Sequence, residues 1–345
     1  MILPFGFCPE QPERQQNLAH VLQGLREDLA YPNYRIVVTE LGLEATQRLM
    51  AKEFGAEYIF AAESGEFSPG RAMNVGFLGR DSAADLVYFH QADFLVAPDV
   101  LGEGVGKLTD LGCPFVYPYW GEIHLSRPVS GAVRSGLIPA TALVEVFKAA
   151  VGRWRMRDEP AARQEDLSHS EIIPDELDIA ETAAWLPADL SRALIESGYE
   201  ELWGLDDREY APYSWRPGIS AASRLCRVSA GPRASAAYLC TDAAFRRVGG
   251  IPELPGWGYE DLMFWRTVQA FHPYESDRRG ISLQGEPITL GYPLLHLWHP
   301  VGGRPAYYEA TRRNEERYLE FAALDSAGRR ARVRPLPPSA AVPTV

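Results

Sequence analysis

The sequence predicts an α/β fold: a doubly wound, mainly parallel sheet flanked by helices, with a helical insertion. In the first 120 residues, short apolar runs alternate with amphipathic stretches, as expected of consecutive strand–helix units. The same alternation returns after residue 233. A chain of 345 residues, 46% of them hydrophobic, is also large enough to bury the core of such a fold.

The elements of the first part follow in order. An apolar strand at residues 1–7 precedes a helix in which Leu18, Val21, Leu22 and Leu25 recur at helical spacing. We expect further strands at 34–40, 56–62 and within 84–101, and helices at 15–29, 44–55 and within 68–82. Ligands of open α/β sheets bind beyond the carboxyl ends of the strands, so polar residues near these ends are candidates for a site. They are Glu40, Arg71, Asn74, Gln91 and Asp93.

Two stretches depart from this pattern. Between residues 121 and 232 the alternation fades, and the acidic segment 158–209 contains several short helical patterns. We interpret residues 121–232 as an insertion into a single domain that spans residues 1–325. Residues 326–345, rich in Pro, Ala and Arg, are expected to form a disordered tail.

Composition narrows the classes of partner. The chain has 34 Lys and Arg residues and 46 Asp and Glu residues, which gives a net charge of −12. This negative charge disfavours nucleic acid and an anionic membrane as main partners. Cys8, Cys113, Cys226 and Cys240 form no Cys-x-x-Cys motif, which is typical of reduced thiols in a cytoplasmic protein. We expect no signal peptide and no transmembrane segment, whereas peripheral contact with a membrane stays open.

The segment "GWGYEDLMFW" carries the first candidate group. Gly256 and Gly258 flank Trp257 and free the backbone to turn, so that the indole is presented outward. Glu260 and Asp261 then occupy the first turn of a predicted helix, where carboxylates are favoured, so both are expected to stay ionised. Adjacent helical residues point about 100° apart, so one carboxylate can deprotonate a sugar hydroxyl while the other binds a second hydroxyl. The alternative is an ordinary helix start beside a core tryptophan.

Asp93 ends a hydrophobic strand in "YFHQADFLVAP". A carboxylate at that position can coordinate Mg²⁺ or Mn²⁺ that also bridges a diphosphate. Gln91 lies on the same face of the strand and can hydrogen-bond a ribose or a metal-bound water. A single Asp after a strand is common, so this signal needs support from other residues.

Three more candidates lie near the predicted strand ends. Glu40 can accept a hydrogen bond from a base or a ribose, and the alternative is a solvated loop carboxylate. Arg71 and Asn74 are three residues apart on one helix face, where Arg71 can reach a phosphate and Asn74 can brace the loop. The alternative is a solvated arginine and a capping asparagine.

His296 and His299, in "LLHLWHP", can add nitrogen donors to the oxygen of Asp93. Residues three apart on a regular strand face opposite sides, and Pro293 and Pro300 disfavour a helix. Both imidazoles can therefore reach one ion only if the strand bends between them. The alternative is a pair of structural histidines that close a strand.

Taken in order, these segments resemble the inverting glycosyltransferases of the GT-A fold, in particular the β-1,4-galactosyltransferases and the chondroitin-polymerase-like bacterial enzymes. The resemblance covers roughly residues 1–120 and 233–300. "GRAMNVGF" is similar to the bacterial Arg-Ala-x-Asn-x-Gly segment, and "HQADFLVAP" stands where the family has Asp-x-Asp. "GGIPELPGWGYED" is similar to Asn-Gly-Phe followed by Gly-Trp-Gly-x-Glu-Asp, and "HLWH" stands where the family has Met/His-x-x-His.

The resemblance implies a role for each matching residue. Asp93 and His299 would bind Mn²⁺ or Mg²⁺, with His296 as a third ligand. Asp261 would be the base that activates the acceptor hydroxyl, and Glu260 would hydrogen-bond a sugar. The other substrate-binding candidates are Trp257, which would stack on a sugar, its neighbour Gly258, and Arg71, Asn74, Gln91 and Glu40 on the donor side.

Three departures from the family pattern concern the donor and the acceptor. "PFGFCPE" replaces the galactosyltransferases' Pro-Phe-Arg-Asn-Arg nucleotide loop, so the uracil and phosphate contacts must differ. Gln91 replaces the first carboxylate of Asp-x-Asp, a loss of charge that a second histidine partly offsets. The insertion at 121–232 has no counterpart in the family and is expected to bind the acceptor.

The resemblance thus implies a metal-dependent, inverting hexosyltransferase. It would move a sugar from a nucleotide sugar, with a UDP-sugar favoured, to a hydroxyl of a carbohydrate or small-molecule acceptor. Three alternatives stay open. A retaining GT-A enzyme would use a similar metal site, and a non-catalytic protein would bind a nucleotide or a sugar without transferring it. The third is a nucleotidyltransferase on a similar fold, which the lack of a Gly-rich phosphate loop with a partner Lys disfavours.

Overall fold

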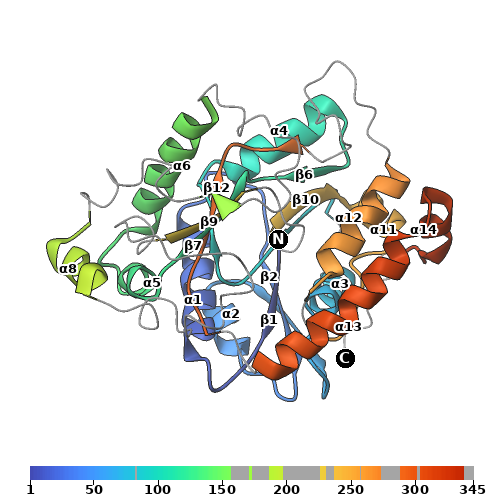
Figure 1. The fold of residues 1–345 in the computed structure, drawn as a ribbon, viewed down its shortest axis with the longest axis horizontal. Coiled ribbons are helices and arrows are strands. Elements are labelled where there is room, and N and C mark those ends of the chain that lie inside the picture. Colours follow the sequence, from blue (N-terminus) through green and yellow to red (C-terminus); the bar gives the residue numbers. More distant parts are fainter. Residues whose placement is uncertain are drawn as a thin grey trace.

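The computed structural model describes residues 1–81, 84–156, 171–172, 186–196, 226–230, 237–256, 258–272, 288–300 and 304–337. Two β-sheets form its framework, with helices around them (Figure 1). The strands are β1 (Ile2–Gly6), β2 (Val37–Gly42), β3 (Glu57–Ala62), β4 (Leu86–His90), β5 (Phe94–Leu95), β6 (Phe115–Tyr117), β7 (Gly121–Leu125), β8 (Glu171–Ile172), β9 (Cys226–Ala230), β10 (Ala237–Thr241), β11 (Ile288–Thr289) and β12 (Pro293–His296). The helices are α1 (Pro12–Glu27), α2 (Arg48–Glu53), α3 (Pro69–Gly79), α4 (Val100–Leu111), α5 (Arg127–Arg134), α6 (Ala140–Met156), α8 (Ala188–Glu196), α11 (Asp242–Arg247), α12 (Glu260–Phe271), α13 (Arg304–Ala322) and α14 (Ser326–Arg332).

The larger sheet has the strand order β11-β6-β10-β4-β1-β2-β3 within the described residues. β1 runs parallel to β2 and β4, and β2 runs parallel to β3, whereas β10 is antiparallel to both β4 and β6. The α/β fold with a mainly parallel sheet is therefore confirmed. The order β3-β2-β1-β4 reverses the direction of winding between β1 and β4, and at such a switch point the loops beyond the carboxyl ends of the strands diverge to leave a crevice.

The smaller sheet has the order β5-β12-β7-β9-β8. β12 lies parallel to β7 and antiparallel to β5. β4 belongs to the larger sheet and β5 to the smaller one, and residues 91–93 alone connect them. Asp93 therefore lies at the junction of the two sheets, on the edge where β4 ends.

The helices pack against these sheets through residues at helical spacing. In α1, Leu18, Val21, Leu22 and Leu25 are buried, and their i, i+3, i+4, i+7 pattern forms one apolar face. Helix α3 begins where the Ser68 hydroxyl accepts a hydrogen bond from the backbone N–H three residues later. Helices α12, α13 and α14 lie together on one side of the molecule, and α5, α6 and α8 on the opposite side (Figure 1).

The described part of the predicted insertion differs from the expectation at its start. Strand β7 lies between β12 and β9, at the centre of the smaller sheet, and α6 packs against β12. The framework of the fold therefore continues through residues 121–156. This role could not be predicted from the sequence, because β12, the parallel partner of β7, lies some 170 residues further along the chain. Residues 157–170, 173–185, 197–225 and 231–232 of the insertion lie outside the described residues.

The prediction of a disordered tail from residue 326 is wrong for residues 326–337. Asp325 caps α14 by accepting a hydrogen bond from the Gly328 N–H at 2.7 Å. Arg330 then donates to the carbonyl of Ala270 in α12, and the Leu336 N–H donates to the carbonyl of Arg246. These bonds hold the segment against α11 and α12, although its Pro, Ala and Arg content is typical of disorder. Residues 338–345 lie outside the described residues.

Two further expectations concern the cysteines and the membrane. No disulfide joins Cys8, Cys113, Cys226 or Cys240, all of which belong to the described residues. Within the described ranges, no helix combines the length and the apolar character that are needed to cross a membrane.

Candidate functional site

Asp93 is placed by the passage of the chain from one sheet to the other. The backbone carbonyl of Asp93 accepts a hydrogen bond from the Leu297 N–H at 2.8 Å. This bond joins a residue just after the end of β4 to the residues that follow β12, which are just over 200 positions further along the chain. The carboxylate of Asp93 and the "HLWH" segment are thereby held side by side.

Both histidines reach the carboxylate of Asp93. His296 is the last residue of β12, and His299 lies in the loop that follows. The Nε2 atoms of His299 and His296 lie 2.9 Å and 3.5 Å from Oδ2 of Asp93. One ligand atom from each of the three residues lies within 4.8 Å of the other two, so the group has the dimensions of a metal site. The structure thus brings the three predicted ligands together.

The bend that allows this is fixed by two helices. The Trp298 N–H donates to Oγ of Ser130 in α5 at 2.8 Å, and Nδ2 of Asn17 in α1 donates to the carbonyl of Leu297 at 3.2 Å. Arg134 donates to the carbonyl of Trp298 at 3.1 Å and to Oδ1 of Asn17 at 2.9 Å. Because these bonds satisfy the backbone polar groups of residues 297 and 298, the chain leaves the strand conformation without an unpaired buried group there.

The donor set fits a divalent cation. Nδ1 of His299 lies 2.9 Å from the carbonyl oxygen of Pro300, which can only accept, so Nδ1 carries the hydrogen. A neutral His299 therefore presents the lone pair of Nε2 to the carboxylate of Asp93. Two acceptors at this distance repel each other unless a proton or a cation lies between them. Two imidazoles and one carboxylate suit a first-row ion such as Mn²⁺ better than Mg²⁺.

Electrostatics at the cluster favour an ionised Asp93. Burial by itself would raise the pKa of Asp93, but the nearby His296 and His299 outweigh this effect and hold that pKa well below its usual range. Burial lowers the pKa of His299, the nearby carboxylate of Asp93 opposes this effect, and the charge of Arg14 lowers the pKa further. Arg14, in the first turn of α1, has its own pKa lowered by burial and partly restored by Asp93. An arginine therefore stands beside the candidate metal site.

The histidine cluster extends into β7. His124 lies directly opposite His296 in the β12–β7 register, and their Nδ1 atoms are 3.0 Å apart. On its other side, Nε2 of His124 lies 3.4 Å from Oε2 of Glu122, a residue that is 4% exposed. Glu122 and His124 are two apart on one strand and thus share a face.

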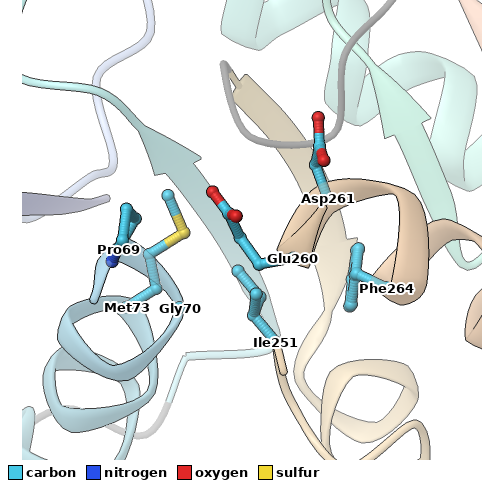
Figure 2. A pocket seen from close by; sticks show the side chains of 7 residues that line it. All are labelled: Pro69, Gly70, Met73, Ile251, Glu260, Asp261 and Phe264. Carbon is cyan, nitrogen blue, oxygen red and sulfur yellow. The ribbon is translucent and has the colours of Figure 1, made fainter. Parts of the chain in front are cut away.

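A second group of carboxyl groups lies at the start of α12 (Figure 2). Glu260 and Asp261 line a pocket together with residues of α3, and Glu260 points toward Met73 of that helix. Helix α3 follows β3, so its start lies at the carboxyl edge of the larger sheet, the edge that also carries Asp93. The remaining lining residues are Pro69, Gly70, Ile251 and Phe264.

The two carboxyl groups differ in environment. Glu260 is 3% exposed, and in the described part of the chain its Oε2 has no hydrogen-bond partner. Burial, followed by the charge of Asp261, raises the pKa of Glu260 to about 8, so that this side chain is mainly protonated at neutral pH. The expectation that both carboxyl groups stay ionised is therefore wrong for Glu260, because burial outweighs the favourable helix start. Asp261 is partly exposed, and its Oδ1 accepts a hydrogen bond from the Leu262 N–H at 2.7 Å.

The backbone before α12 adopts left-handed conformations. Gly256 and Gly258 have φ of 74° and 99°, and Tyr259 has φ of 69°, a value that is uncommon for a non-glycine residue. A Cβ atom on Gly256 would clash with Ala310 of α13, so glycine is required there. Trp257, the predicted sugar-stacking residue, lies outside the described residues. The turn predicted from the two glycines is present.

The structure separates the roles of the α3 residues. Asn74 is buried, and its amide donates to the Ile251 carbonyl at 2.8 Å and accepts from the Ile251 N–H at 3.0 Å. Asn74 therefore braces the loop before α12, and this use of both ends of the amide opposes the predicted contact with substrate. Arg71 pairs with Glu63 at 2.9 Å, and its side chain is 44% exposed, so it keeps access to solvent beside the pocket.

Glu40 does not match the role predicted for it. It is fully buried, and its carboxylate accepts hydrogen bonds from the backbone N–H groups of Thr46 and Gln47 and from the hydroxyls of Thr46 and Tyr58. It closes the loop between β2 and α2 and has no access to a nucleotide in this arrangement. Gln91 is also buried, next to Asp93 at the sheet junction.

Three residues near Asp93 and His296 could not be predicted from the sequence. Glu122 and His124 show the two-residue spacing of a strand face, but nothing in the sequence pairs β7 with β12. Arg14 looks like an ordinary polar residue of an amphipathic helix. Its position beside Asp93 follows only from the strand order, which sets the start of α1 next to the end of β4.

The chain is similar to solved structures, whereas family models and curated proteins do not match it. No protein-family model matches the sequence, and no curated protein matches it. Among solved structures, the glucosyl-3-phosphoglycerate synthase from Mycobacterium tuberculosis with Mn²⁺, UDP-glucose and glycerol 3-phosphate has a TM-score of 0.44 and 12% identity, over 92% of this chain and 78% of that chain. S. aureus TarS 1–349 in complex with UDP-GlcNAc has a TM-score of 0.42 and 12% identity, over 95% of this chain and 68% of that chain. TM-scores below 0.5 at 12% identity assign neither a family nor an activity to this chain.

Proposed function

We propose that the protein is a metal-dependent glycosyltransferase of the GT-A type that transfers a sugar from a nucleotide sugar to an acceptor hydroxyl, with inversion at the anomeric carbon. The observation that carries this proposal is the convergence of Asp93, His296 and His299 at the switch point of the sheet. The order of motifs, from "GRAMNVGF" to "HLWH", supports the reaction class.

The donor would lie at the sheet junction. Asp93, His296 and His299 would hold Mn²⁺, which when bound supplies positive charge against the departing nucleoside diphosphate. Arg14 adds a fixed positive charge beside the same carboxylate. Arg71, at the start of α3, has a partly exposed guanidinium, and its planar fork suits a phosphate. A UDP-sugar is the first donor to test.

The acceptor would lie at the start of α12. A base must be unprotonated, and the raised pKa of Glu260 keeps that side chain mainly neutral at pH 7. The proton of the acceptor hydroxyl therefore goes to Asp261, whose carboxylate is oriented by the Leu262 N–H. The neutral carboxyl group of Glu260 can donate a hydrogen bond to a sugar oxygen, the contact predicted for it from the sequence.

The proposed reaction is a single displacement. The acceptor oxygen forms a bond to the anomeric carbon as the bond from that carbon to the diphosphate oxygen breaks. Asp261 removes the acceptor proton, and the positive groups at the sheet junction stabilise the leaving diphosphate. No covalent intermediate forms, so the configuration at the anomeric carbon inverts.

A screen of nucleotide sugars tests the proposal. We expect one nucleotide sugar to raise the melting temperature in the presence of Mn²⁺ and to be hydrolysed slowly without an acceptor. NMR of the transfer product then gives the anomeric configuration, and retention would replace the inverting mechanism by the retaining one. Binding of a nucleotide sugar without hydrolysis or transfer to any acceptor in a broad panel would favour the non-catalytic alternative.

A further inference from the structure

The candidate metal site has a second layer that neither the resemblance nor the sequence analysis includes. Glu122 and His124 lie on β7, one strand away from the ligand His296. Together the residues form a continuous row from Asp93 through His296 and His124 to Glu122. The row begins and ends with a carboxylate.

The contacts along this row are close and use defined atoms. Nε2 of His296 faces Asp93, and Nδ1 of His296 faces Nδ1 of His124 at 3.0 Å. The two imidazole rings meet edge to face, with centroids 4.8 Å apart and an interplanar angle of 72°. Nε2 of His124 faces Glu122 at 3.4 Å. On its opposite side, the His296 ring contacts Phe94, so packing limits its rotation.

The chemistry of the groups sets the direction of the hydrogen bonds. When Glu122 is ionised, its carboxylate can only accept, so the hydrogen of His124 resides on Nε2. Nδ1 of a neutral His124 then carries a lone pair and accepts from Nδ1–H of His296. A neutral His296 with its hydrogen on Nδ1 keeps a lone pair on Nε2, the atom that faces Asp93. The opposite direction would require Glu122 to donate.

We propose that His124 and Glu122 are positioning residues that hold His296 in the tautomer able to bind a metal. They act through His296 and do not touch the ion or the substrate. The inference rests on the cation-binding part of the proposed function. A ligating histidine is commonly oriented by an acceptor on its second nitrogen, and loss of such a partner typically weakens metal binding about 10- to 100-fold.

The test compares two substitutions of nearly equal shape. His124→Leu removes the acceptor, whereas His124→Asn keeps an amide oxygen near the position of Nδ1, with its NH₂ group available to Glu122. Glu122→Gln keeps the size of the side chain but allows it to donate to His124, which releases the constraint on the tautomer. His20→Leu, in the middle of α1, removes an imidazole that is not part of the row and serves as the control.

Two measurements apply to each full-length variant. Electron paramagnetic resonance of free Mn²⁺ gives the affinity for the ion without any sugar donor. Nitrogen-15 NMR of histidine-labelled, metal-free protein shows which ring nitrogen of His296 carries hydrogen. We expect Mn²⁺ affinity to fall about 10- to 100-fold in His124→Leu and less in Glu122→Gln, and to stay near wild type in His124→Asn and His20→Leu. His296 should be in the Nδ1–H form in the wild type and mixed in Glu122→Gln.

Several outcomes would overturn the inference. Unchanged Mn²⁺ affinity in His124→Leu, equal losses in His124→Leu and His124→Asn, or an Nε2–H form of His296 in the wild type would each do so. A wild type that binds no Mn²⁺ would overturn the cation site together with the inference. Because no measurement depends on sugar transfer, a protein that binds Mn²⁺ as described but transfers no sugar would disprove the proposed reaction and leave the inference standing.

Discussion

The two groups of candidate residues are built in different ways. The cluster around Asp93 collects side chains from four segments, and hydrogen bonds from α1 and α5 hold its backbone. The pair at the start of α12 comes from two adjacent residues, and a left-handed backbone places them. The first group aims acceptor atoms at one point, whereas the second places two similar carboxyl groups in different environments.

This difference indicates what each group can do. Converging lone pairs are stable only around a positive charge, so the first group is suited to holding a cation. Two carboxyl groups, one of them neutral at pH 7 and the other partly exposed, can donate to one hydroxyl and accept from another. Four substitutions test whether the two groups divide the work in this way.

The largest effect is expected from Asp261→Asn. If Asp261 takes the acceptor proton, the rate of sugar transfer should fall about 10²- to 10⁴-fold, the usual contribution of a general base. Mn²⁺ affinity should stay the same, because the metal cluster is a separate group. Asp189→Asn, at the same position in the first turn of α8, is the matched control and should be silent. Undiminished transfer in Asp261→Asn would disprove the assignment of the base.

The next effect concerns the cation. Asp93→Asn removes the one carboxylate among the three proposed ligands. We expect Mn²⁺ affinity to fall by more than about 100-fold, since even the loss of a partner behind a ligand weakens binding about 10- to 100-fold. Titration followed by electron paramagnetic resonance measures it, with the exposed Asp110→Asn as control. Binding of Mn²⁺ at wild-type strength to Asp93→Asn would place the ion elsewhere.

Glu260→Gln tests the environment of the second group. The pKa of Glu260 is about 8 in the folded chain against an ordinary 4.5, so the native state holds its proton while the unfolded state has released it. Native stability from this group is thus fully present below pH 4.5 and is lost as the pH rises to 8. Between pH 4.5 and pH 9, the free energy of unfolding of Glu260→Gln should rise relative to that of the wild type by up to about 5 kcal/mol, because a shift from 4.5 to about 8 is worth about 1.4 kcal/mol per pKa unit.

Urea unfolding between pH 5 and pH 9 measures this difference. The exposed Glu316→Gln on α13 is the control and should show no such trend. If the stability difference between Glu260→Gln and the wild type did not grow with pH, Glu260 would have to be ionised in the folded protein, and the two carboxyl groups would no longer differ.

The smallest effect is expected from Ser130→Ala. This substitution leaves the N–H of Trp298 buried without its acceptor, which costs about 1 to 3 kcal/mol of unfolding free energy. Mn²⁺ affinity should also decline a few-fold, because the bend between the histidines is loosened. Ser135→Ala, at the exposed end of the same helix, provides the control. An unchanged stability would show that the hydrogen bond from Trp298 does not fix the bend.

The parts that could be predicted from the sequence are those whose information is local. Strands β1 to β4 and helices α1 and α3 have apolar patterns of their own, and all were expected near their observed positions. The condition that the chain must bend after His296 also followed from strand geometry alone. It is met by contacts with Ser130, Asn17 and Arg134, which could not be foreseen because they join distant segments.

The errors have the same physical origin. Glu40 looked like a loop carboxylate because its acceptance of the Thr46 and Gln47 N–H groups depends on how the next loop folds back. Strand β7 lacked a visible partner, so Glu122 and His124 were hidden within the supposed insertion. The polar segment after residue 325 gave no sign of its attachment to α12.

The position of Asp93 between the two sheets has a mechanical consequence. Its carboxylate comes from the end of a strand in the larger sheet, and the histidines come from the end of a strand in the smaller one. An ion held by all three residues would therefore be a reversible cross-link between the two sheets. Binding and removal of the ion would then change how strongly the larger sheet is attached to the smaller one.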